Sequence, residues 1–281
     1  MFSSRLRVLT ILAAFVCTAV VSKDEAISQI PVADSAQAEA LLKFGKAAAE
    51  YEISMAGDST PFKLNPRSIM NWTNPARLGE NGATYLWFHN GRPQVIATIF
   101  TYVSNDEVRE KQVFHSLATS KIESVIDGKK VWHPSKPGVT FKPIPGAPEP
   151  AATSTRRRLQ MRLLSQRFSG EMQDRKSRKT ALRSVPAPLV TYEPKDGPCQ
   201  SGAIFSLAVG TDTEAVVLIE SRQVGEKWKW QYAVARFHYN ELSVSLDQEQ
   251  VWSVPAKFAY FGNRRSDFSF REEVYISYRP D

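Results

Sequence analysis

Six prolines fall within 17 residues near the middle of the chain: Pro134, Pro137, Pro143, Pro145, Pro148 and Pro150. Each proline lacks a backbone N–H and restricts the residue before it, so a run this dense forms neither a helix nor a central strand. The segment 134–152 is therefore predicted to be an extended connector. It separates two parts of similar length, 23–133 and 153–281.

The N-terminus gives a second constraint. Two arginines precede the apolar stretch Val8–Val21, and the chain turns polar at Ser22. This arrangement is typical of a secretory signal peptide and is short for a membrane-spanning helix. We expect residues 1–22 to be cleaved and the protein to be exported, to the periplasm or out of the cell. An uncleaved anchor and a lipoprotein modified at Cys17 are the alternatives.

Cleavage would leave Cys199 as the one remaining cysteine. An exported chain with one cysteine has no internal disulfide, so the fold must rest on an apolar core. Hydrophobic residues are 42% of the chain, which is enough for such a core and excludes a wholly disordered protein. We favour Cys199 as a small residue packed under a loop over a reactive thiol.

Apolar periodicity predicts the same order of elements on each side of the connector. The first part should hold a helix from Asp34 to about Met55, a loop over 57–81, and strands that include a hairpin turning at Asn90-Gly91. The second should hold a basic N-terminal helix over Thr153–Lys176. The expected strands are 83–89, 94–103, 113–117, 122–126 and 130–132, then 203–209, 215–222, 227–239 and 242–246.

This order predicts an α+β fold, with antiparallel sheets each packed by one main helix. Gly-Ala and Phe-His dipeptides recur in the same order on both sides, at Gly82 and Phe114 and again at Gly202 and Phe237. Two dipeptides leave open whether the two halves are similar by duplication or by chance. A helix gripped by a curved sheet, as in ketosteroid-isomerase-like folds, is one way to build such a layer.

One sheet face is predicted to carry a ligand site. If 215–222 pairs with 228–236 around Gly225, side chains alternate so that one face has an apolar, aromatic middle and charged ends. In this register Glu214 faces Arg236. A half-buried face with ion pairs at its edge is the simpler interpretation, and a pocket wall for a small organic ligand is the functional one. The candidate ligand-binding residues are Glu214, Glu220, Arg222, Trp228, Trp230 and Arg236.

Residues 134–185 carry 12 basic and 3 acidic side chains. The net charge of this segment, +9, exceeds the net charge of the whole chain, +7. This segment could bind a polyanion such as acidic lipid headgroups or an acidic polysaccharide of the cell envelope. Export argues against nucleic acid as the partner, and the aromatic residues do not interleave with the charges in a way that suggests base stacking. A solvated helix face is the simpler interpretation. The candidate polyanion-binding residues are Arg156, Arg157, Arg158 and Arg162.

Motifs for nucleotide binding, serine hydrolysis and zinc proteolysis are missing from the sequence. The four histidines, His89, His115, His133 and His238, are scattered, and none has another histidine, cysteine or carboxylate at metal-ligand spacing. We therefore expect no metal and no cofactor. A histidine satisfied within a strand is the simpler interpretation of His115 and His238.

Several short stretches resemble those of a large group of exported planctomycete proteins to which no activity is assigned. They are Gly91-Arg92-Pro93, Phe114-His115-Ser116-Leu117, Pro145-Gly146-Ala147-Pro148, Gly210-Thr211-Asp212 with Glu214, and Leu218-Ile219-Glu220 with Arg222. The resemblance spans roughly residues 80–255 and implies export, but it supplies no catalytic residue. Thr213 stands where the group has proline, which affects only the turn.

Two functions from different classes follow. The first is a non-enzymatic binding or interaction module of the cell envelope, with an anionic envelope component or a small organic ligand as its partner. The alternative is a small-molecule enzyme with a sheet-lined pocket of ketosteroid-isomerase-like type, which needs only one carboxylate and a few hydrogen-bond donors. The absence of a nucleophile–base motif favours the first. A cavity converging on Glu214, Glu220 or His115 would favour the second.

Overall fold

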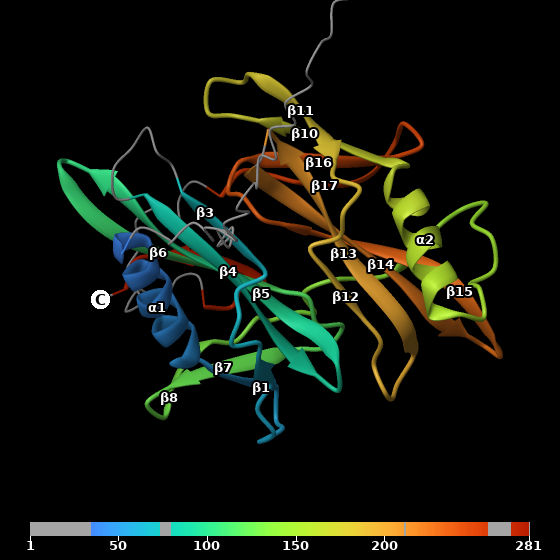
Figure 1. Cartoon of the computed structure of the whole chain (residues 1–281), viewed down its shortest axis with the longest axis horizontal. Coiled ribbons are helices and arrows are strands. Elements are labelled where there is room, and N and C mark those ends of the chain that lie inside the picture. Colours follow the sequence, from blue (N-terminus) through green and yellow to red (C-terminus); the bar gives the residue numbers. More distant parts are fainter. Residues whose placement is uncertain (1–34, 74–79, 211, 258–270, 281) are drawn as a thin grey trace, which may run out of the picture. The chain divides into compact units, whose positions relative to one another are not determined.

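The computed structural model describes residues 35–73, 80–210, 212–257 and 271–280. This part of the chain forms two helices and eighteen strands (Figure 1). The helices are α1 (Ser35–Ala49) and α2 (Ser154–Ser165). The strands up to the connector are β1 (Glu52–Met55), β2 (Lys63–Leu64), β3 (Met70–Thr73), β4 (Asn81–His89), β5 (Arg92–Ser104), β6 (Glu107–Ser116), β7 (Ile122–Ile126) and β8 (Lys129–Trp132). The later strands are β9 (Lys142–Pro143), β10 (Phe168–Gln173), β11 (Lys179–Ser184), β12 (Val190–Tyr192), β13 (Cys199–Val209), β14 (Asp212–Val224), β15 (Lys227–Arg236), β16 (Glu241–Leu246), β17 (Glu249–Val254) and β18 (Tyr275–Tyr278).

The predicted α+β class is wrong, because the fold is mostly β with large curled antiparallel sheets. Both helices end well before their predicted ends. Residues Glu52–Met55, which were expected to finish the first helix, form β1 and pair with β7. Residues Phe168–Gln173, expected in the second, form β10 between β11 and β16. Pairing with distant strands overrides a helical pattern that only local residues support.

The predicted hairpin between β4 and β5 is confirmed. His89 pairs with Arg92, and the two turn residues Asn90 and Gly91 both have positive φ, at 48° and 80°. A type I′ turn requires positive φ at both central positions, which asparagine and glycine tolerate best.

The strands form three antiparallel sheets. A six-stranded sheet has the order β18-β6-β5-β4-β2, with β3 also paired to β4. A nine-stranded sheet has the order β17-β16-β10-β11-β13-β14-β15-β9, with β12 also paired to β13. A small third sheet contains β1, β7 and β8. The connector 134–152 contains no helix and only the short strand β9.

The strand pairings of residues 168–254 repeat those of residues 52–132. From β2 and β11 onward, the repeat is offset by 120 positions. Ala83 on β4 pairs with Ile99 on β5, and Ala203 on β13 pairs with Ile219 on β14. Both hairpins carry a bulge at the same place, and β7–β8 and β16–β17 share a second one. We call 35–133 the first half and 153–257 the second half.

The Gly-Ala dipeptides lie at equivalent positions of the two halves. A Cβ on Gly82 would lie 2.2 Å from the Trp72 ring, and one on Gly202 would lie 2.5 Å from the Tyr192 ring. Each ring belongs to the residue opposite the glycine on the neighbouring strand. Glycine is therefore required by the close approach of an aromatic ring.

The Phe-His dipeptides, in contrast, are not equivalent. His115 pairs with Ile96, and the residue that pairs with Val216 at the corresponding position is Ala235 rather than His238. The second Phe-His dipeptide is therefore not a structural counterpart of the first.

The strand that follows each half in sequence pairs with the opposite half. β9 follows the first half in sequence but pairs with β15, and β18 follows the second half but pairs with β6. The six-stranded and the nine-stranded sheet thus each take an edge strand from beyond the opposite half.

Three clusters of buried side chains form the core. One lies between α1 and the six-stranded sheet, and a second lies between α2 and the nine-stranded sheet. The third joins the halves and includes Leu86 and Ile96 from the first and Ile204, Val216 and Leu218 from the second.

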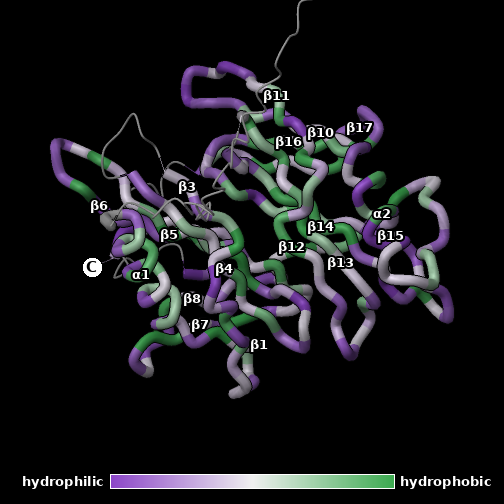
Figure 2. Tube along the Cα trace, in the orientation of Figure 1, coloured by the Kyte–Doolittle hydropathy of each residue, from purple (hydrophilic) through white to green (hydrophobic). Residues whose placement is uncertain are grey.

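Figure 2 shows hydrophobic residues along β13 and β14 and hydrophilic residues at the β10–β11 turn. In the part of the chain described, no helix has the length and apolarity needed to cross a membrane.

Candidate functional site

A cavity of about 1010 Å³ lies where the first-half sheet meets the β13–β14 turn of the second half. Its walls come from the face of β5, β6 and β18 that α1 does not cover, together with β3, Glu80 and the residues after β15. Six aromatic side chains and five ionisable ones line it. The aromatic residues are Trp72, Phe100, Tyr102, Phe237, Tyr239 and Tyr275. The ionisable residues besides tyrosine are Glu80, Lys111, Asp212, Glu214 and His238.

Glu214 is aimed into this cavity by a β-bulge. Leu207 pairs with Ala215 and Ala208 pairs with Thr213, which leaves Glu214 as the extra residue of β14. Bulges of this kind redirect one side chain out of the regular alternation. The backbone carbonyl of Glu214 accepts hydrogen bonds from the N–H groups of the two residues that follow β15, which fixes the bulge in place.

One carboxylate oxygen of Glu214, Oε2, is buried without a donor among the described residues. Only 6% of the residue is exposed, and Oε2 has no hydrogen-bond partner among the described residues. Burial, and then repulsion from Asp212, raises the pKa of Glu214 from 4.5 to about 7. A buried polar oxygen without a partner is uncommon in folded proteins, and where it lines a cavity it marks a place for a ligand or water donor.

His238 does not supply that donor. Its Nδ1 lies 3.6 Å from Glu214 Oε2. The same nitrogen already accepts a hydrogen bond from the N–H of Asn240 at 3.2 Å. Burial, and then the charge of Arg236, lowers the pKa of His238 from 6.5 to about 4, so the imidazole is neutral at neutral pH. A neutral acceptor beside a carboxylate leaves the carboxylate unsatisfied.

Lys111 is the second unusual ionisable group in the cavity, and its residue is 1% exposed. Burial, and then repulsion from Arg279 and Arg175, lowers the pKa of its ammonium from 10.5 to about 7. Sequence reasoning missed this residue because the strand was expected to begin at Val113. The available signal was its spacing, since Lys111 is two residues from Val113 and so on the same face.

Arg236 organises the loop beside the cavity rather than pairing with Glu214. Its guanidinium donates to the carbonyls of His238, Asn240 and Pro255 at 2.6–2.9 Å. It also lies 4.9 Å from the centre of the Tyr275 ring. The predicted register was wrong by one residue, because Arg236 pairs with Ala215.

The physical reason is the turn. The prediction centred the turn on Gly225, whereas Gly225 and Glu226 form a two-residue turn and Val224 pairs with Lys227. A slip of one residue moves every side chain of a strand to the other face. Trp228 therefore lies opposite Gln223, and Trp230 is buried in the core under α2.

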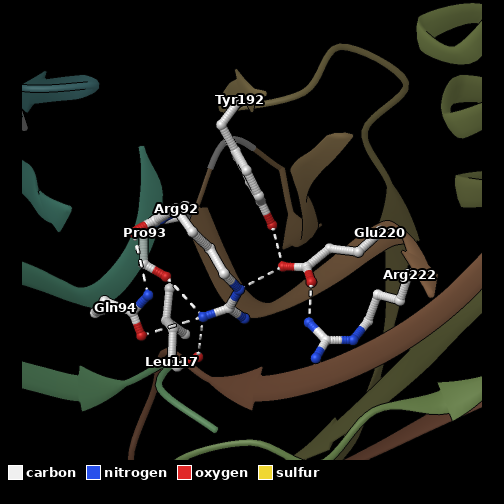
Figure 3. Close-up of polar contacts among 7 residues, drawn as sticks. All are labelled: Arg92, Pro93, Gln94, Leu117, Tyr192, Glu220 and Arg222. Carbon is white, nitrogen blue, oxygen red and sulfur yellow. Dashed lines mark hydrogen bonds and ion pairs between the residues drawn. The ribbon is translucent and has the colours of Figure 1, made fainter. Parts of the chain in front are cut away.

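Glu220 and Arg222 are on one face as predicted, but they belong to a filled ion cluster (Figure 3). Glu220 is fully buried and accepts from Arg92 Nε at 2.9 Å, from the Tyr192 hydroxyl at 2.7 Å and from Arg222 at 2.6 Å. Arg92 also donates to the Leu117 carbonyl at 3.0 Å. The cluster joins β5 of the first half to β14 of the second.

This cluster lies at the positions that correspond to the cavity when the two halves are matched by the 120-residue offset. Adding or subtracting the 120-residue offset turns each of its members into a cavity-lining residue. Arg92, Pro93, Gln94, Leu117, Tyr192, Glu220 and Arg222 correspond to Asp212, Thr213, Glu214, Phe237, Trp72, Phe100 and Tyr102. At one set of corresponding positions the side chains form internal salt bridges, and at the other set they line a cavity.

His115 and Cys199 behave as core residues. His115 is 5% exposed and its ring lies 6.0 Å from that of Tyr275. Burial, and then the charge of Arg236, lowers its pKa to about 3 and keeps it neutral. Cys199 is buried in the core between the halves, and burial raises the pKa of its thiol, which disfavours the reactive thiolate.

The four arginines proposed for polyanion binding do not act as one group. Arg157 is buried and donates to Ser201 Oγ at 3.0 Å and to the carbonyls of Ala151 and Ala152. Arg156, Arg158 and Arg162 remain exposed on α2. Arg157 therefore anchors the start of α2 and leaves three arginines facing solvent.

Comparisons with models of known protein families, with curated proteins and with solved structures found no match. Among the described residues no cluster of three or more histidine, cysteine or carboxylate side chains could hold a metal ion. The site is therefore interpreted from its own geometry.

Proposed function

We propose that this chain is an exported, non-enzymatic protein that binds a small organic molecule in the cavity. The observation that carries the proposal is the buried, unpartnered Glu214 Oε2 in a cavity of about 1010 Å³. Small-molecule sites are typically concave, with apolar and aromatic walls and a few polar groups that fix orientation. The aromatic walls and the few buried polar groups support this interpretation.

A cavity-filling substitution tests the proposal. Val113 is half-buried in the cavity wall on β6, and Val108 is 60% exposed on the same strand, outside the cavity. We expect Val113→Trp to block the site and Val108→Trp to leave it open. The protein purified from its own cells would be extracted and its small molecules identified by mass spectrometry. The same molecules recovered from Val113→Trp as from wild type would refute the proposal.

Export rests on the signal-like residues 1–22, which lie outside the described residues. Mass spectrometry of the native protein should show a start near Val20 or Lys23. An intact Met1 or a lipid on Cys17 would contradict cleavage.

One observation favours the alternative of a small-molecule enzyme. The pKa of Glu214, raised to about 7, suits a general base near neutral pH. Under that alternative Glu214→Gln would abolish turnover of the recovered molecule while it still bound. For the binding protein proposed here, we expect no turnover from wild type.

A further inference from the structure

The ion cluster around Glu220 shows which groups can occupy the positions that correspond to the cavity. The buried carboxylate of Glu220 is satisfied by two guanidinium groups, from Arg92 and Arg222. Both guanidiniums also lie near the ring of Phe141, at 5.4 and 4.3 Å from its centre. In this cluster the guanidinium groups thus contact both a carboxylate and an aromatic ring.

The cavity has no arginine at the two corresponding positions, and its carboxylates stand at positions other than that of Glu220. The positions of Arg92 and Arg222 are taken by Asp212 and Tyr102. The turn now contributes Asp212 and the buried Glu214, and the sheet contributes aromatic rings. The carboxylate of Glu214 thus shares the cavity with aromatic side chains, and its Oε2 has no donor among the described residues.

We infer that the cavity selects organic cations, with an ammonium or guanidinium group held by Glu214 and Asp212 and an apolar body against Trp72 and Phe100. This inference rests on the proposed function and names its ligand class. Charge-assisted hydrogen bonds to a carboxylate are roughly twice as strong as neutral ones, and cations are attracted to aromatic faces.

The other charged groups that face the cavity are Glu80, Lys111 and His238. Glu80 adds a third carboxylate. His238 accepts from the Asn240 N–H and is neutral, so it does not repel a cation. Lys111 lies on β6 opposite Phe100 in the sheet register and is the one cavity lysine among the described residues. Its pKa of about 7 means that it loses its charge as pH rises, which favours cation binding further.

Three probes of one shape and different charge test the inference. They are 1-naphthylmethylamine, 1-naphthalenemethanol and 1-naphthoate, each titrated calorimetrically into the full chain at pH 8. We expect the amine to bind about tenfold tighter than the alcohol, and Glu214→Gln to remove most of that advantage. The net charge of +7 would favour naphthoate in non-specific binding, so a preference for the amine reports on the cavity.

The outcomes separate this inference from the proposed function. If no probe binds wild type, or if binding is unchanged in Val113→Trp, cavity binding itself fails and the inference fails with it. If the alcohol or naphthoate binds as tightly as the amine, the cavity binds organic molecules but the cation preference is wrong. An advantage that persists in Glu214→Gln also overturns the inference. Weaker amine binding at pH 6 than at pH 8 supports it, because Glu214 is then mostly protonated.

Discussion

Glu214 gains its chemistry from one extra residue in β14. The bulge turns its side chain from the sheet surface into the cavity, where burial makes the charged form unfavourable. The corresponding bulge residue in the other hairpin is Gln94, whose amide accepts a hydrogen bond from Arg92 at 3.3 Å. The same backbone irregularity therefore supports a satisfied amide in one half and a carboxylate with one unsatisfied oxygen in the other.

Glu214→Gln should make stability less dependent on pH. The pKa of Glu214 is about 7 in the folded protein against 4.5 as the ordinary value, so the folded state holds the proton more tightly. Wild type therefore loses stability as pH rises from about 4.5 through 7, and the glutamine variant does not. At pH 8 the variant should be more stable by roughly 3 kcal/mol.

Urea unfolding of both proteins at pH 5 and pH 8 measures this difference. Lys111 and His238 also titrate, but both are present in both proteins, so their contributions largely cancel. A stability difference that is the same at both pH values would contradict the assigned burial of Glu214.

At the scale of elements, the neighbours of a strand decided what the local pattern left undetermined. Phe168 and Met172 fit a helical stripe that continues from α2, yet they lie in β10 between two other strands. Gly202 shows the same dependence, because the ring of Tyr192 on β12 fills the space where a side chain would be.

Two glycine substitutions should act in opposite directions. Gly202→Ala would place a Cβ 2.5 Å from the Tyr192 ring and should destabilise the protein by about 1–3 kcal/mol. Gly45→Ala is the control, since its Cβ in α1 would make only an ordinary contact at 3.7 Å from Tyr85. It should stabilise by about 0.5–1 kcal/mol. Thermal unfolding measures both, and equal effects would show that the close contact is absent.

At the scale of the whole chain, the two halves are held together by exchanged strands and by the ion cluster. β9 and β18 each complete the sheet of the opposite half, and Glu220 binds Arg92 across the junction. Because each half lacks an edge strand without the other, we expect residues 35–280 to unfold as one unit.

Glu220→Gln should weaken this junction. It leaves Arg92 and Arg222 buried or half-buried without their counter-charge, which should destabilise by about 3–5 kcal/mol. Glu226→Gln in the exposed β14–β15 turn is the control and should change stability by less than about 0.5 kcal/mol. Urea unfolding followed by fluorescence measures both. Two separate transitions, or equal effects of the two substitutions, would show that the cluster does not join the halves.

The sequence by itself determined the features that depend on neighbouring residues. Asn90-Gly91 and Asp127-Gly128 form turns because those residues tolerate positive φ, and the proline run excludes a helix from 134–152. Glu214 could be singled out as a carboxylate beside a turn in an apolar region, although its predicted partner was wrong.

Only the tertiary structure decided the register of β14 and β15, the ends of both helices and the exchange of β9 and β18. The cavity belongs to the same group, since its walls combine β3, β5, β6 and β18 with residues 212–214 and 237–239. Those contacts arise from packing between strands far apart in sequence. Local propensities barely distinguish a turn centred on Gly225 from a turn at Gly225-Glu226. That difference of one residue determines which side chains of β14 and β15 lie opposite each other.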